Sequence, residues 1–357
     1  MYYKADWSEA RERIEAWWRG DVVDRVAISV YAPRAEPIPG HPYPSPVSPE
    51  QAWTDVSYRL EAVEAYCCHT YFGGEEYPRL NPSMGPGTLA LFLGARPTWM
   101  MDTVWFDTVL DDLSEATALS YDLDNQWWRL CQRLVSEGMR RGRDRYLVVL
   151  PDLIENLDTL ASLHGIEELL IALVEHQEAV RRAQQRIVSL YSEYYDCLFE
   201  LANGPVLGSG FHLHAPWAPG RMAKVQCDIG VMISPRQFEE LAFPYYVQQC
   251  ERLDYVIWHL DGRANLRHLD CILELPNIHA IQWVPGAGDL PEASREWFPL
   301  YRRIRSAGKS LELSVEIGEV EPMVRELGPE GLLLRTAAET EQEAKQLLRE
   351  ARSWTKS

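Results

Sequence analysis

The sequence predicts an α/β protein in which parallel strands close into a (β/α)8 barrel, the TIM-barrel fold, with an N-terminal helical and extended addition. From about residue 145 onward, short apolar runs alternate with long helical patterns. Runs that are apolar on both faces and separated by helices are typical of a parallel sheet covered by helices. Two similar runs in the N-terminal half bring the strand number near eight, which favours a closed barrel over an open sheet. The expected strands span residues 146–150, 206–213, 225–233, 255–260, 279–284, 311–317 and 331–335.

The N-terminal part has its own pattern. The spacing of residues 7–19 predicts an amphipathic helix, and a short apolar run follows at 26–30. Seven prolines between residues 33 and 49 predict an ordered, extended loop, because proline fixes φ and blocks helix formation. Ser48-Pro49 then has the chemistry of a helix start. We expect that helix to end at Gly73-Gly74.

Length and charge limit the classes of protein. The sequence of 357 residues contains no repeat and no Gly/Ser linker. We therefore expect one domain over 1–357, in which 1–100 is an extension packed on a barrel core of 101–357. The net charge of −18 repels nucleic acid and anionic membrane surfaces. No apolar run approaches the roughly 20 residues that span a bilayer, and no signal-peptide pattern is present, so we expect a cytoplasmic protein, monomeric or homodimeric.

Polar residues follow the ends of several expected strands, where barrel enzymes carry their working groups. We expect His259, Asp261, Asp228 and Asp152 to be catalytic. Thirteen Trp and seventeen Tyr also favour an aromatic-lined pocket for a small molecule. The residues expected to bind substrate are His212, His214, Trp217, Trp258, Gln282, Trp283 and Arg335.

The turn His259-Leu260-Asp261-Gly262 is the most informative of these motifs. Residues two apart on a strand point to the same face, so His259 and Asp261 can meet one cation or one substrate. Imidazole and carboxylate suit zinc, and without a metal the same pair can act as an acid/base couple. A structural role is also open for the carboxylates, because a strand-end Asp such as Asp152 or Asp228 often caps the next helix.

Several segments resemble the uroporphyrinogen decarboxylase superfamily, and more closely its corrinoid-dependent methyltransferase branch. Residues 255–262, followed by Leu266-Arg267-His268-Leu269-Asp270, carry the main likeness. Residues 233–238, residues 281–288 and Gly318-Glu319-Val320-Glu321-Pro322 agree with it. The likeness covers about residues 145–350 well and the N-terminal third loosely.

The resemblance implies a barrel and a metal site. In the methyltransferase branch, a His-x-Cys pair and a later Cys hold zinc. His259 matches the His, Asp261 stands in place of the first Cys, and no Cys lies near Glu316. The resemblance therefore implies a harder zinc site of His259, Asp261 and Glu316, with Cys227, His212 and His214 as reserve ligands.

The function implied is transfer of a methyl group between a small methylated substrate and a corrinoid protein or thiol acceptor, assisted by the metal. Trp217, Trp258 and Trp283 would form the walls of the substrate pocket. A metal-free decarboxylase or lyase, with Arg335 as carboxylate clamp, is a second hypothesis. The single arginine of the Pro-rich loop, Arg34, suits a polyanionic tetrapyrrole poorly. A carbohydrate-active barrel and a non-catalytic binding paralogue are the third and fourth hypotheses.

Overall fold

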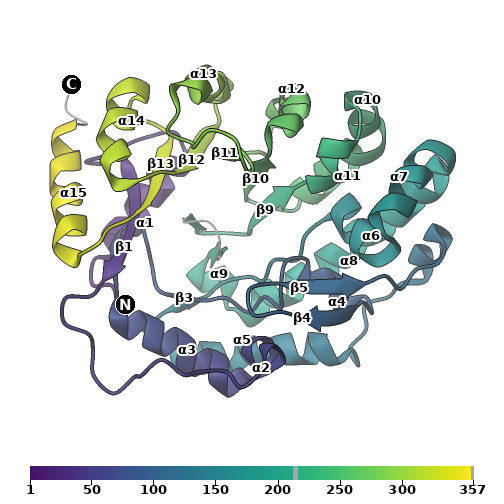
Figure 1. Ribbon diagram of the computed structural model, residues 1–357, viewed down its shortest axis with the longest axis horizontal. Helices are drawn as coiled ribbons and strands as arrows, with labels where there is room; N and C mark the ends of the chain where they lie inside the picture. The colour runs from purple at the N-terminus through teal and green to yellow at the C-terminus, as the bar shows by residue number, and fades with distance from the viewer. Residues whose placement is uncertain (212–215, 355–357) are drawn as a thin grey trace.

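The main sheet of the protein has seven strands in the order β2-β1-β13-β12-β11-β10-β9 (Figure 1). The structure, a computed structural model, describes residues 1–211 and 216–354. Six strands of the main sheet are parallel, and β2 pairs antiparallel with β1 at one edge. The strands of this sheet are β1 (Ala27–Pro33), β2 (Thr70–Gly74), β9 (Met222–Gln226), β10 (Tyr255–Asp261), β11 (Ala280–Val284), β12 (Ser310–Ser314) and β13 (Leu332–Ala337).

Short strand pairs occupy the part of the chain between β2 and β9. β3 (Arg79–Leu80) pairs in parallel with β6 (Leu147–Val148), and β7 (Ser209–Gly210) pairs antiparallel with β8 (Trp217–Ala218). A parallel bridge joins Leu150 to Phe211. Within the described residues no strand ladder links these pairs to the edges of the main sheet. The described strands therefore do not form the closed barrel that the sequence predicts. They form a mixed α/β fold with one large, mostly parallel sheet.

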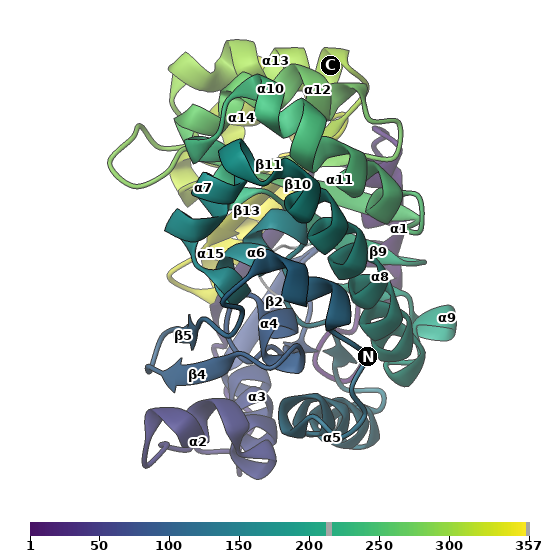
Figure 2. The same ribbon diagram turned by 90° about the vertical axis from the view of Figure 1, so that its right-hand side faces the viewer.

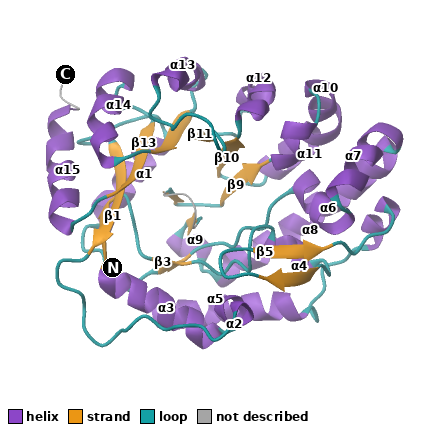
Figure 3. Cartoon of the chain, in the orientation of Figure 1, coloured by secondary structure: helices purple, strands orange, loops and turns teal. Residues whose placement is uncertain are grey.

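Helices surround the strands on the outside, and α11 to α15 form an arc beyond the main sheet (Figures 1 and 3). Among the described helices, none is both long enough and apolar enough to cross a bilayer. The helices are α1 (Trp7–Trp18), α2 (Pro49–Thr54), α3 (Val56–His69), α4 (Thr88–Phe92), α5 (Gln126–Gly142), α6 (Asn156–His164), α7 (Ile166–Glu175), α8 (Gln177–Leu201), α9 (Gly204–Leu207), α10 (Pro235–Gln237), α11 (Phe243–Cys250), α12 (Leu269–Glu274), α13 (Phe298–Ser306), α14 (Val320–Leu327) and α15 (Glu341–Trp354). Short 3-10 or π segments are η1 (Leu113–Ala118), η2 (Asp228–Met232), η3 (Phe238–Ala242), η4 (Arg263–His268), η5 (Arg295–Trp297) and η6 (Ile317–Glu319).

The N-terminal segment is part of the sheet and does more than pack against it. The apolar run at 26–30 lies in β1, which pairs with β13. Residues 27–33 of the expected N-terminal extension are therefore a strand of the main sheet. Ser48 caps α2 as expected, but the helix ends at Thr54, where Asp55 caps the new helix α3. Gly73 and Gly74 lie at the end of β2, not at a helix end.

A floor of three tryptophans closes the N-terminal ends of the strands. We call Trp17, Trp18 and Trp217 the tryptophan floor; all three are buried. The Trp17 indole donates to the carbonyl of Leu311 at 3.3 Å, and the Trp18 indole donates to the carbonyl of Trp217 at 2.8 Å. Helix α1 is thereby fixed across the start of the sheet.

Above the floor, the inner face of the sheet changes from apolar to polar. The first layer contains Ile257, Ala280 and Leu333, which belong to the same apolar cluster as the tryptophans. The next layer is polar because side chains two residues further along a strand point to the same side. We call this layer the polar belt; it consists of Gln226, His259, Gln282, Glu312 and Arg335.

Candidate active site

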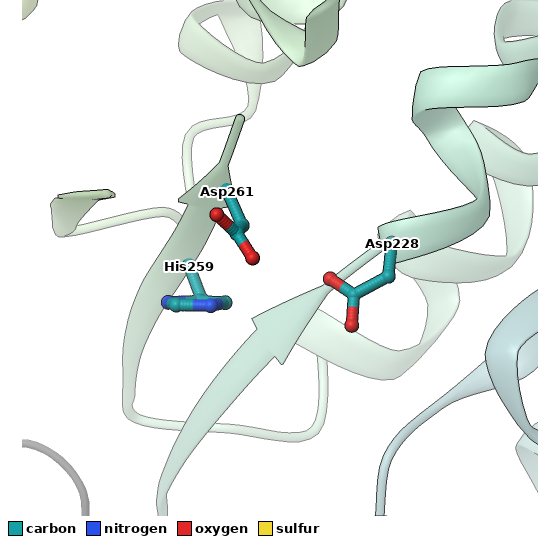
Figure 4. A group of neighbouring side chains, drawn as sticks. All are labelled: Asp228, His259 and Asp261. Atoms are coloured by element: carbon teal, nitrogen blue, oxygen red, sulfur yellow. The ribbon is translucent and has the colours of Figure 1, made fainter. Parts of the chain in front are cut away.

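Three side chains meet where strands β9 and β10 end (Figure 4). His259 and Asp261 lie two residues apart on β10, and Asp228 follows β9 at the start of η2. One ligand atom from each residue lies within 4.8 Å of the other two. We call Asp228, His259 and Asp261 the carboxylate–histidine cluster. The expected pairing of His259 with Asp261 is therefore present, and Asp228 is its third member.

The imidazole of His259 is oriented by its neighbour in the polar belt. Its Nδ1 lies against Oε1 of Gln282, which is the register partner of His259 on β11. Since the amide oxygen only accepts, Nδ1 carries the proton and the lone pair lies on Nε2. Gln282, which we expected to bind substrate, thus positions the histidine.

Asp228 is held by hydrogen bonds on both its backbone and its side chain. Its backbone N–H donates to Asp158 at 2.8 Å, and Gln226 Nε2 donates to its side chain at 2.7 Å. Asp228 is exposed at its outer side, yet desolvation by the surrounding protein raises its pKa to about 6; Lys224 opposes this rise, and Asp261 adds to it. A carboxyl with such a pKa exchanges its proton near neutrality, which suits acid/base work.

Buried acidic groups surround Lys224 beside the cluster, and no local sequence pattern indicates Lys224, Glu155 or Asp158. Lys224 Nζ lies 3.2 Å from Oδ1 of Asp152, and both side chains are buried. Burial raises the pKa of Glu155 well above its ordinary value and raises that of Asp158 to about 7. Burial lowers the pKa of Lys224, but the carboxylates outweigh this effect and the pKa is raised. The expected catalytic Asp152 is an ion-pair partner of the lysine.

Two expected metal ligands lie away from the cluster. Glu316 is exposed and forms a reciprocal cap with Glu319 at η6, because strand β12 ends at Ser314 and turns before it. Cys227 is buried in the main core beside Tyr246. His212 and His214 lie outside the described residues. The expected ligand set therefore needs Asp228 in place of Glu316.

The three tryptophans expected in the pocket wall are core residues. Trp258 packs edge-on against Tyr246 at 5.0 Å between ring centroids, and Trp283 packs against Trp297 at 5.0 Å. Side chains alternate along a strand, so the neighbours of the inward-facing His259 and Gln282 face the helices. Trp217 lies in the tryptophan floor.

Arg335 faces the inside of the sheet, as a substrate-binding role requires. Its Nε lies 3.8 Å from Oε1 of Glu312, which is fully buried. Arg335 borders two cavities of about 320 and 390 Å³. Arg335 therefore lies where a ligand in either cavity could contact it. The carboxylate of Glu312 balances part of its charge.

A cleft of about 540 Å³ begins at Asp228. Its lining includes the acidic residues Asp158 and Asp228 and the aromatic residues Trp105 and Phe106 of the β4–β5 hairpin. This hairpin consists of β4 (Arg96–Trp99) and β5 (Val104–Asp107) and projects from the body of the protein (Figure 2). A small molecule in the cleft can therefore touch a member of the cluster.

Comparison with known proteins identifies the fold and leaves the activity open. No protein-family model matches the chain, and no characterised protein matches it in sequence. Among solved structures, a methyltransferase from Methanosarcina mazei is similar, with a TM-score of 0.60 over 96% of this chain and 98% of that one. The two proteins share a fold. Their identity is 12%, so the likeness concerns architecture over nearly the whole length, and chemistry has to be argued from the site.

Proposed function

We propose that the protein is a methyltransferase that moves a methyl group between a small methylated compound and a corrinoid protein or a thiol acceptor. The carboxylate–histidine cluster carries this proposal, because it lies at the strand ends of a fold shared with a methyltransferase. The sequence likeness to the corrinoid-dependent branch of the uroporphyrinogen decarboxylase superfamily supports the same reaction. The residues of the resemblance and those of the cluster coincide at His259 and Asp261.

The cluster fits a divalent metal, and zinc is our first candidate. Two carboxylates and one imidazole are donors that zinc accepts, at about 2.0–2.2 Å from the metal. Ligand atoms within 4.8 Å of one another need only small movements to converge on one ion. When bound, the metal would polarise the heteroatom that carries the methyl group and make it a better leaving group. We assign Asp228, His259 and Asp261 as its ligands.

The chain's own residues prepare this site. Gln282 fixes the His259 tautomer, so Nε2 offers its lone pair to the site. Lys224 offsets the charge of the surrounding carboxylates. Trp105 and Phe106 line the cleft that contains Asp228 and offer an apolar surface to a bound methyl group. These three contributions would orient the metal ligand and the substrate at the reacting centre.

The β4–β5 hairpin supports docking of a corrinoid-carrying partner at the mouth of the cleft. Met100, Met101 and Trp105 are exposed on it, and Trp105 also lines the cleft. Exposed Met and Trp side chains are typical of protein interfaces. A partner that covers the hairpin would bring its corrinoid next to the site.

Metal analysis of protein purified without chelator tests the site. We expect about one zinc per chain in the wild type and loss of the metal in His259→Ala and Asp228→Asn. Glu316→Gln is the matched control, because Glu316 is exposed and outside the cluster. Formation of methylcobalamin from cob(I)alamin and a panel of methylamines and aryl methyl ethers tests the reaction. A metal-free wild type, or retention of metal in both cluster variants, would contradict the proposed site.

A metal-free lyase is the second candidate, and the raised pKa of Asp228 favours it. In that reaction the carbon–carboxylate bond breaks, carbon dioxide leaves, and the carbanion takes a proton from Asp228. Release of carbon dioxide by chelator-treated protein, lost in Asp228→Asn, would select this candidate over methyl transfer.

A further inference from the structure

A second cavity lies at the other end of the polar belt from the cluster. It has a volume of about 320 Å³. Its lining consists of two arginines, three tyrosines, one acidic residue and one amide: Arg79, Arg335, Tyr31, Tyr66, Tyr77, Glu76 and Asn81. Arg79 belongs to β3, and Tyr31 and Arg335 belong to the neighbouring strands β1 and β13. The cavity therefore opens at the strand ends and is separate from the cleft beside Asp228.

Two hydrogen-bond donors in this cavity lack a well-placed acceptor among the described residues. Nη1 of Arg79 and the hydroxyl of Tyr77 are both buried, and neither completes a hydrogen bond of good geometry in this part of the chain, although the two side chains interact with each other. The guanidinium of Arg79 lies over the Tyr77 ring, 4.5 Å from its centroid. Buried donors of this kind are rare in folded proteins and need an explanation, such as a ligand that supplies the acceptor.

The rest of the Arg79 guanidinium is held in place by the protein. Its Nη2 lies 2.7 Å from Oε1 of Glu76, and Ser29 Oγ donates to the other oxygen of Glu76. This arrangement fixes the plane of the guanidinium. Nη1 takes no part in the contact with Glu76. A preorganised guanidinium with an unused N–H favours an acceptor-only group with a flat shape, which is a carboxylate.

The walls of the cavity indicate what the carboxylate is attached to. Tyr31 and Tyr66 line the cavity and are 44% and 40% exposed, so their rings border its mouth. Aromatic walls favour a flat ring. Glu76 and Glu312 already balance the charges of Arg79 and Arg335. Any anion therefore finds little excess positive charge and has to gain from hydrogen bonds. An aromatic acid gains in addition from contact between its ring and the tyrosines.

We propose that this cavity binds the carboxylate of a flat aromatic acid through Arg79 and Tyr77, with the ring between Tyr31 and Tyr66. The substrate class then becomes a methylated aromatic carboxylic acid, a step that rests on the proposed function. The carboxylate site itself is independent of metal and of methyl transfer.

Titration of chelator-treated protein with 4-bromobenzoate tests the site directly. We expect saturable binding by calorimetry, at least about tenfold weaker binding of neutral 4-bromobenzamide, and a similar loss in Arg79→Met. Arg140→Met is the matched control, because Arg140 is exposed on α5 and is expected to leave binding unchanged. If Arg79→Met does not fold, Arg79→Lys is the second variant. It keeps a positive charge for Glu76 but loses the planar, two-pronged guanidinium, so we expect it to weaken binding as well.

Anomalous scattering from the bromine then locates the probe. Bromine near Tyr31 and Tyr66 is the expected result. Bromine elsewhere, only water in the cavity, equal affinity for the amide, or wild-type affinity in both Arg79 variants would each overturn the proposal. Because the protein is metal-free in this titration, loss of zinc in His259→Ala and loss of 4-bromobenzoate binding are separate results. Either proposal can fail without the other.

Discussion

The imidazole Nδ1 of His259 donates to the side-chain oxygen of Gln282 on the next strand. Gln282 is buried, so solvent does not replace it as an acceptor. This contact decides which ring nitrogen faces the carboxylates of the cluster. Residues behind a metal ligand commonly set its tautomer and its basicity in this way.

Replacement of Gln282 by Leu is expected to weaken zinc binding about 10- to 100-fold, because the His259 ring loses the acceptor that fixes its tautomer. Gln282→Glu keeps an acceptor at the same place and is expected to retain affinity. Competition with a chromophoric chelator measures both constants, and circular dichroism checks the fold. Equal zinc affinity in the wild type and the Leu variant would show that the contact has no role in metal binding.

Lys224→Met is expected to destabilise the protein by about 3–5 kcal/mol, because it leaves buried carboxylates without their cation. Asp152, 3.2 Å from the lysine, is the residue most directly affected. The double variant Lys224→Met, Asp152→Asn should recover part of the loss. Urea unfolding gives the free energies. Lys345→Met, at an exposed ion pair, is the control and should change stability by less than about 0.5 kcal/mol.

Glu155→Gln is expected to change how stability depends on pH. The pKa of buried Glu155 is raised well above 4.5, so the folded protein keeps a proton that the unfolded chain loses. The contribution of this residue is present below about pH 4.5 and declines as pH rises toward the folded pKa, by up to about 1.4 kcal/mol per pH unit. The difference in unfolding free energy, variant minus wild type, should therefore grow with pH. A difference that is constant from pH 5 to 8 would show that Glu155 ionises normally.

Two tryptophan substitutions distinguish the structural role of the tryptophan floor from the proposed docking role of the β4–β5 hairpin. Trp17→Ala is expected to cost about 3–5 kcal/mol, because Trp17 is almost completely buried under the sheet. Trp105→Ala should leave stability within about 0.5 kcal/mol, because Trp105 is exposed. Thermal and urea unfolding measure both. If the Trp105 variant is as unstable as the Trp17 variant, the hairpin has a structural role and no docking role needs to be assumed.

The pair His259 and Asp261 could be predicted because period-two spacing on a strand is a local property. For Asp228 the sequence predicts a catalytic role but places the residue inside a strand at 225–233. The structure ends β9 at Gln226, since the side chain of Asp158 accepts the backbone N–H groups of Asp228 and Ile229 and starts η2. The apolar residues after Asp228 resemble a strand, and only a distant carboxylate reveals the turn.

Tryptophan-rich strand ends were the least informative pattern. Trp258 and Trp283 follow or adjoin polar site residues, yet alternation sends them to the opposite face of the sheet. The ion pair of Lys224 with Asp152 and the burial of Glu155 depend on tertiary contacts that leave no local pattern. The same holds for the antiparallel β2 at the sheet edge, where the sequence predicts a continued helix.

The tryptophan floor has a kinetic consequence. With α1 fixed across the start of the strands, the described residues cover that end of the sheet, and the hairpin borders the mouth of the cleft beside Asp228. The proposed carrier protein, bound over that mouth, would close the cleft and retain the small molecule inside it. Exchange of the small molecule and docking of the carrier then have to alternate, so the two reactants would join in a fixed sequence.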